Sequence, residues 1–115
     1  MLGLSANLRY FMCCQPIDMR NGFDGLSGIV RNYLKKDPVS GDIFIFLNKP
    51  RTHIKLLYWD GDGFALFYKR LEKGRYDRCT TVNKLSVEMK REELLMLLEG
   101  LSYCDMRRKK RFKFR

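Results

Sequence analysis

The middle of the chain alternates large apolar and charged side chains on both sides of a short polar turn. Residues 53–74 read HIKLLYWDGDGFALFYKRLEKG, with Asp-Gly-Asp-Gly at residues 60–63. Period-two alternation is typical of strands, and glycine-rich turns of this kind join antiparallel neighbours. The pattern therefore predicts a β-hairpin, which places aromatic rings and cationic side chains on one small sheet.

Further strands are predicted before and after the hairpin. Residues 43–47 form a continuous apolar run, which is typical of a strand buried on both faces. Residues 8–14 predict an opening strand, residues 75–82 a further strand, and residues 85–89 a short one. Residues 48–52 form a basic loop that leads into the hairpin.

Apolar residues between Met19 and Leu34 recur at steps of three and four, which predicts one face of an amphipathic helix. Asp18 stands where its carboxylate can cap the start of this helix. Asp37-Pro38 ends it, because the residue before a proline avoids helical angles. Glycines within the helix indicate either a close approach by another backbone or partner, or a bent first turn. These glycines are Gly22, Gly25 and Gly28.

A second helix is predicted over residues 91–99, where leucines supply the buried stripe and Gly100 is well placed as a stop. The succession of elements predicts an α+β fold. We expect a small single domain with a mainly antiparallel sheet of four to six strands, two helices and a basic C-terminal tail. The domain is placed at residues 1–106 and the tail, expected to be disordered until bound, at residues 107–115.

The net charge of +10 is unevenly distributed along the chain. Seven of the nine residues from 107 to 115 are Lys or Arg, so residues 1–106 carry about +3, from 16 basic and 13 acidic residues. A basic protein usually meets a polyanion, and nucleic acid is the partner expected first. The tail is then a phosphate-binding arm. The plainer interpretation is a solubilising surface with a flexible tail.

The sequence lacks the signatures of several other protein classes. No apolar run approaches the roughly 18 residues that span a bilayer, and the N-terminus does not read as a signal peptide, so we expect a cytoplasmic protein with no membrane partner. The four cysteines form no C-x-x-C pair, and the single histidine, His53, is distant from them in sequence. This pattern disfavours zinc and favours reduced, partly buried thiols.

Asp60 and Asp62 raise the alternative of a metal site. A calcium loop of the EF-hand type needs further oxygen ligands, whereas Phe-Ala-Leu-Phe follows this turn. A two-metal nuclease needs at least one more convergent carboxylate, which nothing in the spacing demands. No nucleophile motif accompanies His53, and the glycines match no phosphate-binding loop. We therefore interpret the two aspartates as turn residues and expect no metal, no cofactor and no catalytic residue.

Cations and aromatic rings are interleaved in the central third of the chain. Cations neutralise phosphates, and exposed rings stack on unpaired bases. The rings of this region are Tyr58, Trp59, Phe67, Tyr68 and Tyr76. Burial in the core is the alternative for these rings, and a solvated edge is the alternative for the cations. The candidate contacts to nucleic acid or a partner are Arg20, Lys49, Arg51, Lys55, Lys69, Arg70, Lys73, Arg75, Trp59, Arg107, Arg108, Lys109, Lys110 and Arg111.

Three motifs occur in order along the chain: QPIDMRNGFDGL at residues 15–26, DPVSGDIFIF at residues 37–46 and IKLLYWDGDGFALFYKRLEKGRY at residues 54–76. Together they resemble the TnpB accessory-protein family, the product of the second open reading frame of insertion-sequence-sixty-six bacterial transposable elements. The match is collinear over roughly residues 8–101, and the basic tail lies outside it. Ile17 departs from the usual threonine of the family.

The resemblance implies a small protein that is needed for transposition and is encoded beside a larger transposase carrying the catalytic residues. The leading hypothesis is a non-enzymatic accessory factor that binds the DNA of the element ends, the transposase, or both. A protein–protein adaptor without direct DNA contact is the second hypothesis. A metal-dependent nuclease using Asp60 and Asp62 is the third. The sequence leaves the oligomeric state open.

Overall fold

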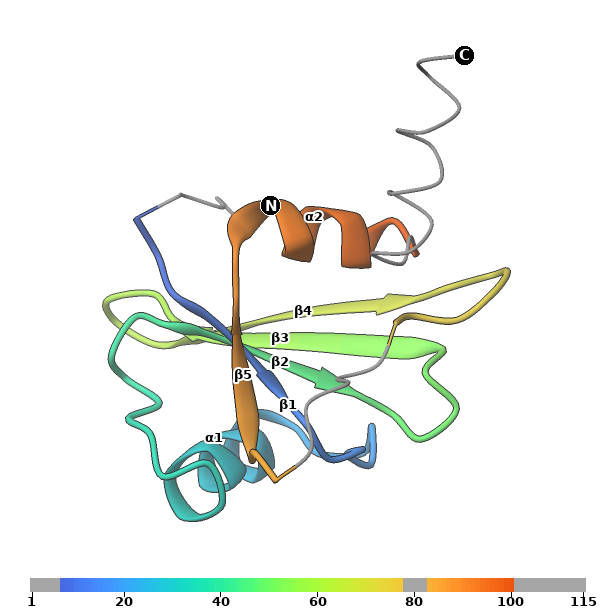
Figure 1. The fold of residues 1–115 in the computed structure, drawn as a ribbon. Helices are drawn as coiled ribbons and strands as arrows, with labels where there is room; N and C mark the ends of the chain where they lie inside the picture. Colours follow the sequence, from blue (N-terminus) through green and yellow to red (C-terminus); the bar gives the residue numbers. More distant parts are fainter. Residues whose placement is uncertain (1–6, 78–82, 101–115) are drawn as a thin grey trace.

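A five-stranded sheet lies between two helices in the computed structural model, which describes residues 7–77 and 83–100 (Figure 1). The elements along the chain are β1 (Tyr10–Cys13), α1 (Phe23–Asn32), β2 (Ile43–Leu47), β3 (His53–Trp59), β4 (Phe64–Arg70), β5 (Ser86–Met89) and α2 (Arg91–Leu98). The predicted α+β class, with one small domain, two helices and four to six strands, is confirmed.

The strand order in the sheet is β4-β3-β2-β1-β5. Among the described strands, β1 and β2 are parallel, and the other three pairs are antiparallel. A parallel pair needs a crossover between its strands, and α1 lies in that connection. The predicted hairpin is confirmed, because β3 and β4 pair in register from His53↔Arg70 to Trp59↔Phe64.

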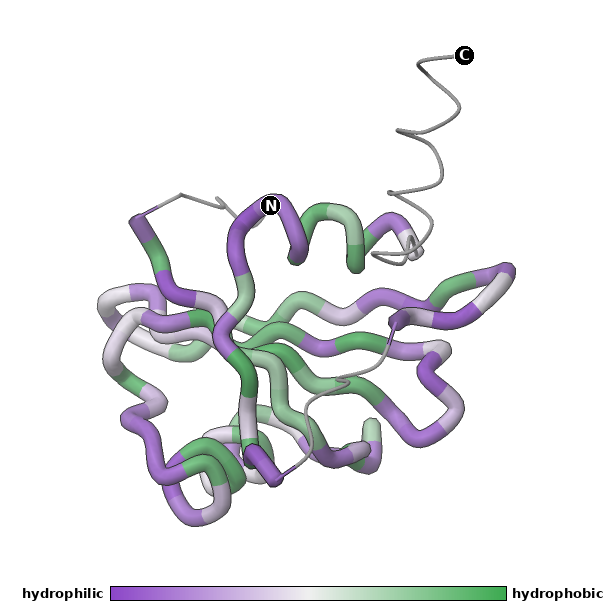
Figure 2. Tube along the Cα trace, viewed as in Figure 1, coloured by the Kyte–Doolittle hydropathy of each residue, from purple (hydrophilic) through white to green (hydrophobic). Residues whose placement is uncertain are grey.

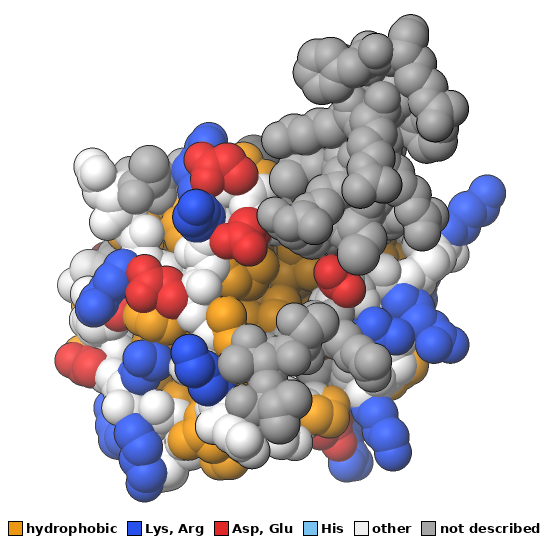
Figure 3. Space-filling view, in the orientation of Figure 1, with side chains coloured by type: hydrophobic (Ala, Val, Ile, Leu, Met, Phe, Trp, Pro, Cys, Tyr) orange, Lys and Arg blue, Asp and Glu red, His pale blue; other side chains and the backbone are white. Residues whose placement is uncertain are grey.

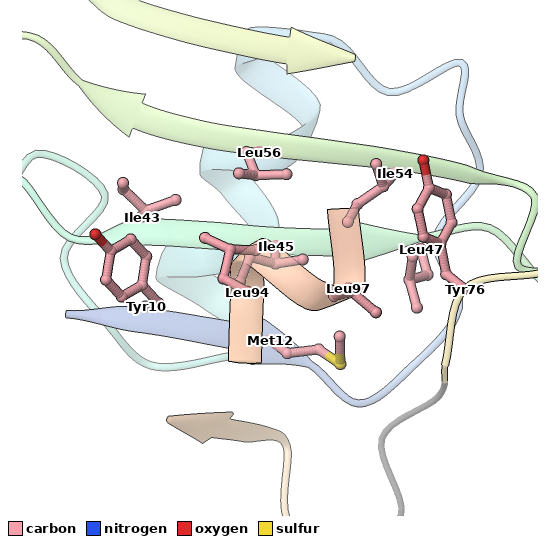
Figure 4. Close-up of a cluster of buried hydrophobic side chains, with 10 residues drawn as sticks. All are labelled: Tyr10, Met12, Ile43, Ile45, Leu47, Ile54, Leu56, Tyr76, Leu94 and Leu97. Atoms are coloured by element: carbon pink, nitrogen blue, oxygen red, sulfur yellow. The ribbon is translucent and has the colours of Figure 1, made fainter. Parts of the chain in front are cut away.

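A hydrophobic cluster lies on each face of the sheet. Strand β2 is therefore buried along its whole length, as predicted. On one face the cluster includes α2, as Figure 4 shows: Tyr10, Met12, Ile43, Ile45, Leu47, Ile54, Leu56, Tyr76, Leu94 and Leu97. On the opposite face the cluster includes α1: Phe11, Cys13, Leu26, Val30, Leu34, Phe44, Phe46 and Leu57. Alternating side chains of β3 enter one cluster or the other, which is the expected consequence of the strand period of two.

Helix α1 begins at Phe23, later than the apolar spacing predicts. The prediction that Asp18 caps this helix is wrong, because the Asp18 carboxylate accepts hydrogen bonds within the preceding turn instead. Asp18 Oδ1 accepts a hydrogen bond from the Arg20 main-chain N–H at 2.8 Å. Gly22 occupies the N-cap position of α1 without a side-chain cap.

Within the described residues, no distant backbone lies close to the three glycines at or within the start of α1. A Cβ atom at Gly25 would collide with the Asn21 side chain, which belongs to the turn just before α1. Gly22 and Gly28 have no atom of another segment close to the position of a Cβ. The crowding at Gly25 fits the irregular entry into the helix, and within the described chain no backbone of another segment approaches the other two glycines.

Residues 75–77 do not form the predicted strand. The Tyr76 main-chain N–H instead donates to the carbonyl of Arg51 at 2.7 Å, and the Tyr76 ring is buried in the cluster that includes α2. The rest of that prediction, residues 78–82, lies outside the described residues.

The cysteines differ from the expectation of reduced thiols. Cys14 is disulfide-bonded in the structure, so the expectation is wrong for this residue. Cys13 is free and buried, and burial raises the pKa of its thiol. Cys79 and Cys104 lie outside the described residues.

The short strand and the second helix predicted near the end of the domain are confirmed as β5 and α2. Glu93 Oε1 accepts a hydrogen bond from the Lys90 main-chain N–H at 2.9 Å, which satisfies one donor at the start of α2. Gly100 has a φ of 77°, a conformation that favours glycine, and it follows the helix where the stop was predicted.

Candidate functional site

The β2–β3 turn and the segment after β4 lie side by side at one end of the sheet. The Leu71 main-chain N–H donates to the carbonyl of Thr52 at 2.9 Å, and the Tyr76 N–H donates to the carbonyl of Arg51 at 2.7 Å. The Arg51 guanidinium also donates to the Tyr76 carbonyl at 3.4 Å. These contacts join two parts of the chain that are about twenty residues apart in sequence.

This pairing gathers cations that the sequence separates. Across residues 48–52 and 70–76 there are five Lys or Arg residues and one acidic residue, Glu72. We call the five the basic end: Lys49, Arg51, Arg70, Lys73 and Arg75. Arg51 is half-buried and the other four are exposed. Figure 2 shows hydrophilic turns at the right of the molecule, and Figure 3 shows Lys and Arg side chains along that edge. Such a concentration of one charge attracts anions.

The Asn48 side chain organises the β2–β3 turn. Its Oδ1 accepts hydrogen bonds from the main-chain N–H groups of Thr52, at 2.9 Å, and His53, at 3.0 Å. Because main-chain N–H groups only donate, these bonds orient the amide, and its Nδ2 then lies 3.1 Å from His53 Nδ1. In this arrangement the Asn48 amide donates toward His53 Nδ1. The turn that presents Lys49 and Arg51 is thus held by side-chain bonds as well as by the sheet.

Lys55 lies apart from the basic end, in the interior. The residue is 6% exposed, and its Nζ donates to the main-chain carbonyls of Met19, at 2.6 Å, and Asn21, at 2.8 Å. The ammonium group also lies 4.7 Å from the centre of the Tyr68 ring. Its donors serve the protein itself, so we leave Lys55 out of the surface proposed below.

Lys69 has a comparable internal partner. Its Nζ donates to the carbonyl of Leu98 at 2.7 Å, at the C-terminus of α2. The last carbonyls of a helix have no partner within it, and a cation there satisfies one of them and suits the helix dipole. Lys69 therefore connects β4 to α2.

Arg20 lies on the turn that precedes α1 and pairs with Asp18. Nη2 of Arg20 lies 2.7 Å from Oδ2 of Asp18, and both side chains are exposed. Hydrogen bonds from the Arg20 side chain, and then from its main chain, lower the pKa of Asp18 to about 2. The same pairing raises the pKa of Arg20. Arg20 remains accessible, with its charge already balanced by a neighbour.

The aromatic side chains occupy different environments. Trp59 packs edge-to-face on Phe64, with ring centres 5.1 Å apart, next to the hairpin turn and at the opposite end of β3 from the basic end. Tyr76 is fully buried. Tyr68 is 52% exposed and lies one residue from Lys69 and two from Arg70. The candidate set drawn from the sequence omits Tyr68, although alternation along residues 64–70 puts it on the same face as Arg70.

The hairpin turn carries Asp60 and Asp62, which are both exposed. The Asp60 main-chain N–H donates to the carbonyl of Gly63 at 2.8 Å, which closes the turn. Within residues 7–77 and 83–100, no group of three or more His, Cys, Asp or Glu side chains is placed to hold a metal ion. No helix in this described part is long and apolar enough to cross a membrane. The candidate residues of the tail, from Arg107 to Arg111, lie outside the described residues.

The chain matches, over residues 8–108, the model of a protein family described as "IS66 Orf2 like protein". The chain belongs to this IS66 Orf2-like family. The match confirms the resemblance and indicates an accessory role in transposition. It also reaches beyond residue 101, so that the first two residues of the basic run, Arg107 and Arg108, fall inside the family region.

Two relatives come from Sinorhizobium fredii (strain NBRC 101917 / NGR234). The uncharacterized protein y4jC is 38% identical over 109 residues, which cover 95% of this chain and 92% of the relative. The uncharacterized protein y4hO is 37% identical over 76 residues, which cover 66% of each chain. No solved structure matches the chain.

Proposed function

We propose that this protein is a cytoplasmic, non-enzymatic accessory factor of transposition that binds the DNA of the element ends and contacts the transposase of the same element. Membership of the IS66 Orf2-like family supports the role in transposition. The DNA contact rests on one observation, the gathering of five cations at the basic end by hydrogen bonds between two turns. Cations in such an arrangement neutralise backbone phosphates and release counterions without reading a base sequence.

The proposal extends to the basic tail and to Arg20. Residues 107–115 carry seven positive charges and would act as a second phosphate-binding arm beside the domain of residues 1–106. Arg20 is a flanking contact, which has to exchange its Asp18 partner for a phosphate. Because both members of that pair are exposed, the exchange costs little.

Binding of a duplex with the terminal repeat, followed by fluorescence anisotropy at several salt concentrations, tests the basic end. The triple variant Lys49→Gln, Lys73→Gln and Arg75→Gln removes three of its exposed charges. Each phosphate contact contributes about 0.9 to the slope of log affinity against log salt. If all three side chains meet phosphates, the slope falls by up to about 2.7 units.

A matched control removes the same charge from exposed positions outside the basic end: Arg31→Gln, Lys35→Gln and Lys84→Gln. The control is expected to leave the slope within about one unit of the wild type, since one contact changes it by about 0.9. Equal effects of the two triple variants would show that only net charge matters, and the basic end would lose its assignment.

Deletion of residues 107–115 tests the tail in the same assay. If its seven charges all meet phosphates, the slope falls by up to about 6 units. An unchanged slope would exclude the tail from the DNA contact.

The alternative function, an adaptor without DNA contact, has its own outcome. A basic surface also suits an acidic protein surface. If the wild-type protein does not bind DNA at low salt, and the transposase co-purifies with the wild type but not with the basic-end variant, the partner of the basic end is the transposase.

A further inference from the structure

Tyr68 is an exposed aromatic residue in the middle of a regular strand. It lies on β4 directly opposite Lys55 on β3, and 52% of the residue is exposed. Four other large hydrophobic residues of the described chain are comparably exposed: Phe23, Val39, Leu85 and Leu95. Tyr68 differs from these because charged and aromatic side chains contact its ring.

The Lys55 ammonium group and the His53 ring both contact the ring of Tyr68. Lys55 Nζ lies 4.7 Å from the ring centre, and Lys55 is itself fixed by hydrogen bonds to the Met19 and Asn21 carbonyls. The His53 ring lies with its centre 5.8 Å from that of Tyr68, at an angle of 38°. The His53 ring is itself held by the Asn48 side chain, whose Nδ2 lies 3.1 Å from His53 Nδ1. The tyrosine is therefore a supported ring with about half of its surface open to solvent.

The surroundings of Tyr68 change along the face of the hairpin. Toward the hairpin turn, Leu57 and Leu66 pack in the cluster that includes α1. In the other direction, the next residue pair on this face is His53 opposite Arg70, which belongs to the basic end. Tyr68 thus lies between the part of the face that α1 covers and the cations proposed to hold phosphates.

The spacing of Tyr68 and Arg70 suits a nucleotide. Two residues along an antiparallel strand span about 6.8 Å, and both side chains leave the sheet on the same face. A base stacked on the tyrosine can therefore place its own backbone phosphate near the guanidinium. Nη2 of Arg70 lies 3.0 Å from Oε1 of Glu72. Because both side chains are exposed, a phosphate can compete with Glu72 for the guanidinium.

We propose that Tyr68 stacks on an unpaired base of single-stranded DNA while Arg70 holds an adjacent phosphate. This inference rests on the proposed function and names its substrate class. Bases within a duplex are already stacked on one another, whereas an unpaired base offers a free face to an aromatic ring. The arrangement therefore favours single strands, such as those exposed when an element end is opened, over intact duplex.

Two labelled DNAs test the inference with the full-length protein: a 15-residue single strand and the corresponding duplex, compared by fluorescence anisotropy at one salt concentration. Tyr68→Ala is expected to weaken single-strand binding by about 5- to 150-fold, the range for loss of one stacked base. Duplex binding is expected to change less than twofold. Tyr68→Phe keeps the ring and is expected to bind both DNAs like the wild type.

A second variant and a second signal distinguish the loss of base stacking from a loss of folding. Tyr68→Leu keeps an apolar side chain over Lys55 without the ring, and it is expected to lose single-strand affinity as Tyr68→Ala does. A 2-aminopurine base within the single strand is expected to be quenched on binding to the wild type and to Tyr68→Phe. The quenching is expected to disappear with Tyr68→Leu.

Unchanged single-strand affinity in Tyr68→Leu, or equal losses for single strand and duplex, would overturn the stacking role. Failure of the proposed function has a different signature, since the basic-end variant would then bind duplex with the wild-type affinity and salt slope.

Discussion

Nζ of Lys55 donates a hydrogen bond of 2.6 Å to the main-chain carbonyl of Met19. The bond joins the hairpin to the turn before α1, and these are two of the three sequence motifs of the family region. A second bond, to the Asn21 carbonyl, closes the other side of the same turn. Lys55 is therefore a structural cation that anchors an irregular segment, in contrast to the exposed lysines of the basic end.

Replacement of Lys55 by methionine keeps the length of the side chain and removes the donors. We expect Lys55→Met to lower the free energy of unfolding by about 1–3 kcal/mol, because two partly buried carbonyls lose their partner. Urea unfolding followed by circular dichroism measures this change. The control Lys49→Met alters an exposed lysine and is expected to stay within about 0.5 kcal/mol of the wild type. Equal values for the two variants would contradict an anchoring role.

The Asp18–Arg20 pair predicts a pH dependence at acid pH. Because the pKa of Asp18 falls from its ordinary 3.8 to about 2 in the folded state, the folded protein binds this proton less readily than the unfolded chain. The pair therefore contributes stability above about pH 4, and that contribution is lost as the pH falls through about 2. A carbon-13 NMR titration of the Asp18 carboxyl group is expected to show a midpoint near 2.

Arg20→Gln separates the cause of this shift from general effects of the fold. Without the guanidinium, the Asp18 midpoint is expected to rise toward 3.8, since the Arg20 side chain is the largest cause of the shift. Added salt is expected to raise the wild-type midpoint as well, because an exposed pair is screened. A midpoint that stays low in Arg20→Gln would show that the turn itself, through the Arg20 main-chain N–H, stabilises the carboxylate.

The hydroxyl of Tyr76 is buried and has no hydrogen-bond partner among the described residues. Burial accordingly raises the pKa of this phenol. A buried hydroxyl without a partner opposes folding, so Tyr76→Phe is expected to raise the free energy of unfolding by about 1 kcal/mol. Tyr68→Phe, at an exposed ring, is expected to change it by less than about 0.5 kcal/mol. Destabilisation by Tyr76→Phe would indicate that the hydroxyl has a partner in solution.

Local sequence signals were sufficient to predict most of the helices and strands. The hairpin, the buried strand β2, the short strand β5 and helix α2 follow from the spacing of apolar residues and from glycine-rich turns, which are short-range properties. The start of α1 was misplaced for a long-range reason. The apolar spacing continues back to Met19, but Lys55 holds the carbonyl of that residue and Asp18 bonds within its own turn.

For the candidate site, the sequence indicates exposure at some positions and leaves others undecided. Lys49, Arg51, Lys73 and Arg75 are close in the sequence to turns, and turn residues are usually exposed, so their positions on the surface could be expected. Lys55 follows the same charge pattern and is buried, because its strand lies beneath the turn before α1. Tyr68 is named among the rings of the sequence but is absent from the candidate set, because the composition of a strand does not show which of its rings remains uncovered.

The sequence by itself determined the fold class, the order and type of most of the elements, and the excess of positive charge, since each depends on composition or on spacings of a few residues. Only the tertiary structure decided which of those charges meet at one end, and which lysines turn inward. The physical reason is that burial and main-chain pairing join residues far apart in the chain. The bond between Tyr76 and Arg51 gathers the basic end, and the bond between Lys55 and Met19 withdraws a cation from the surface.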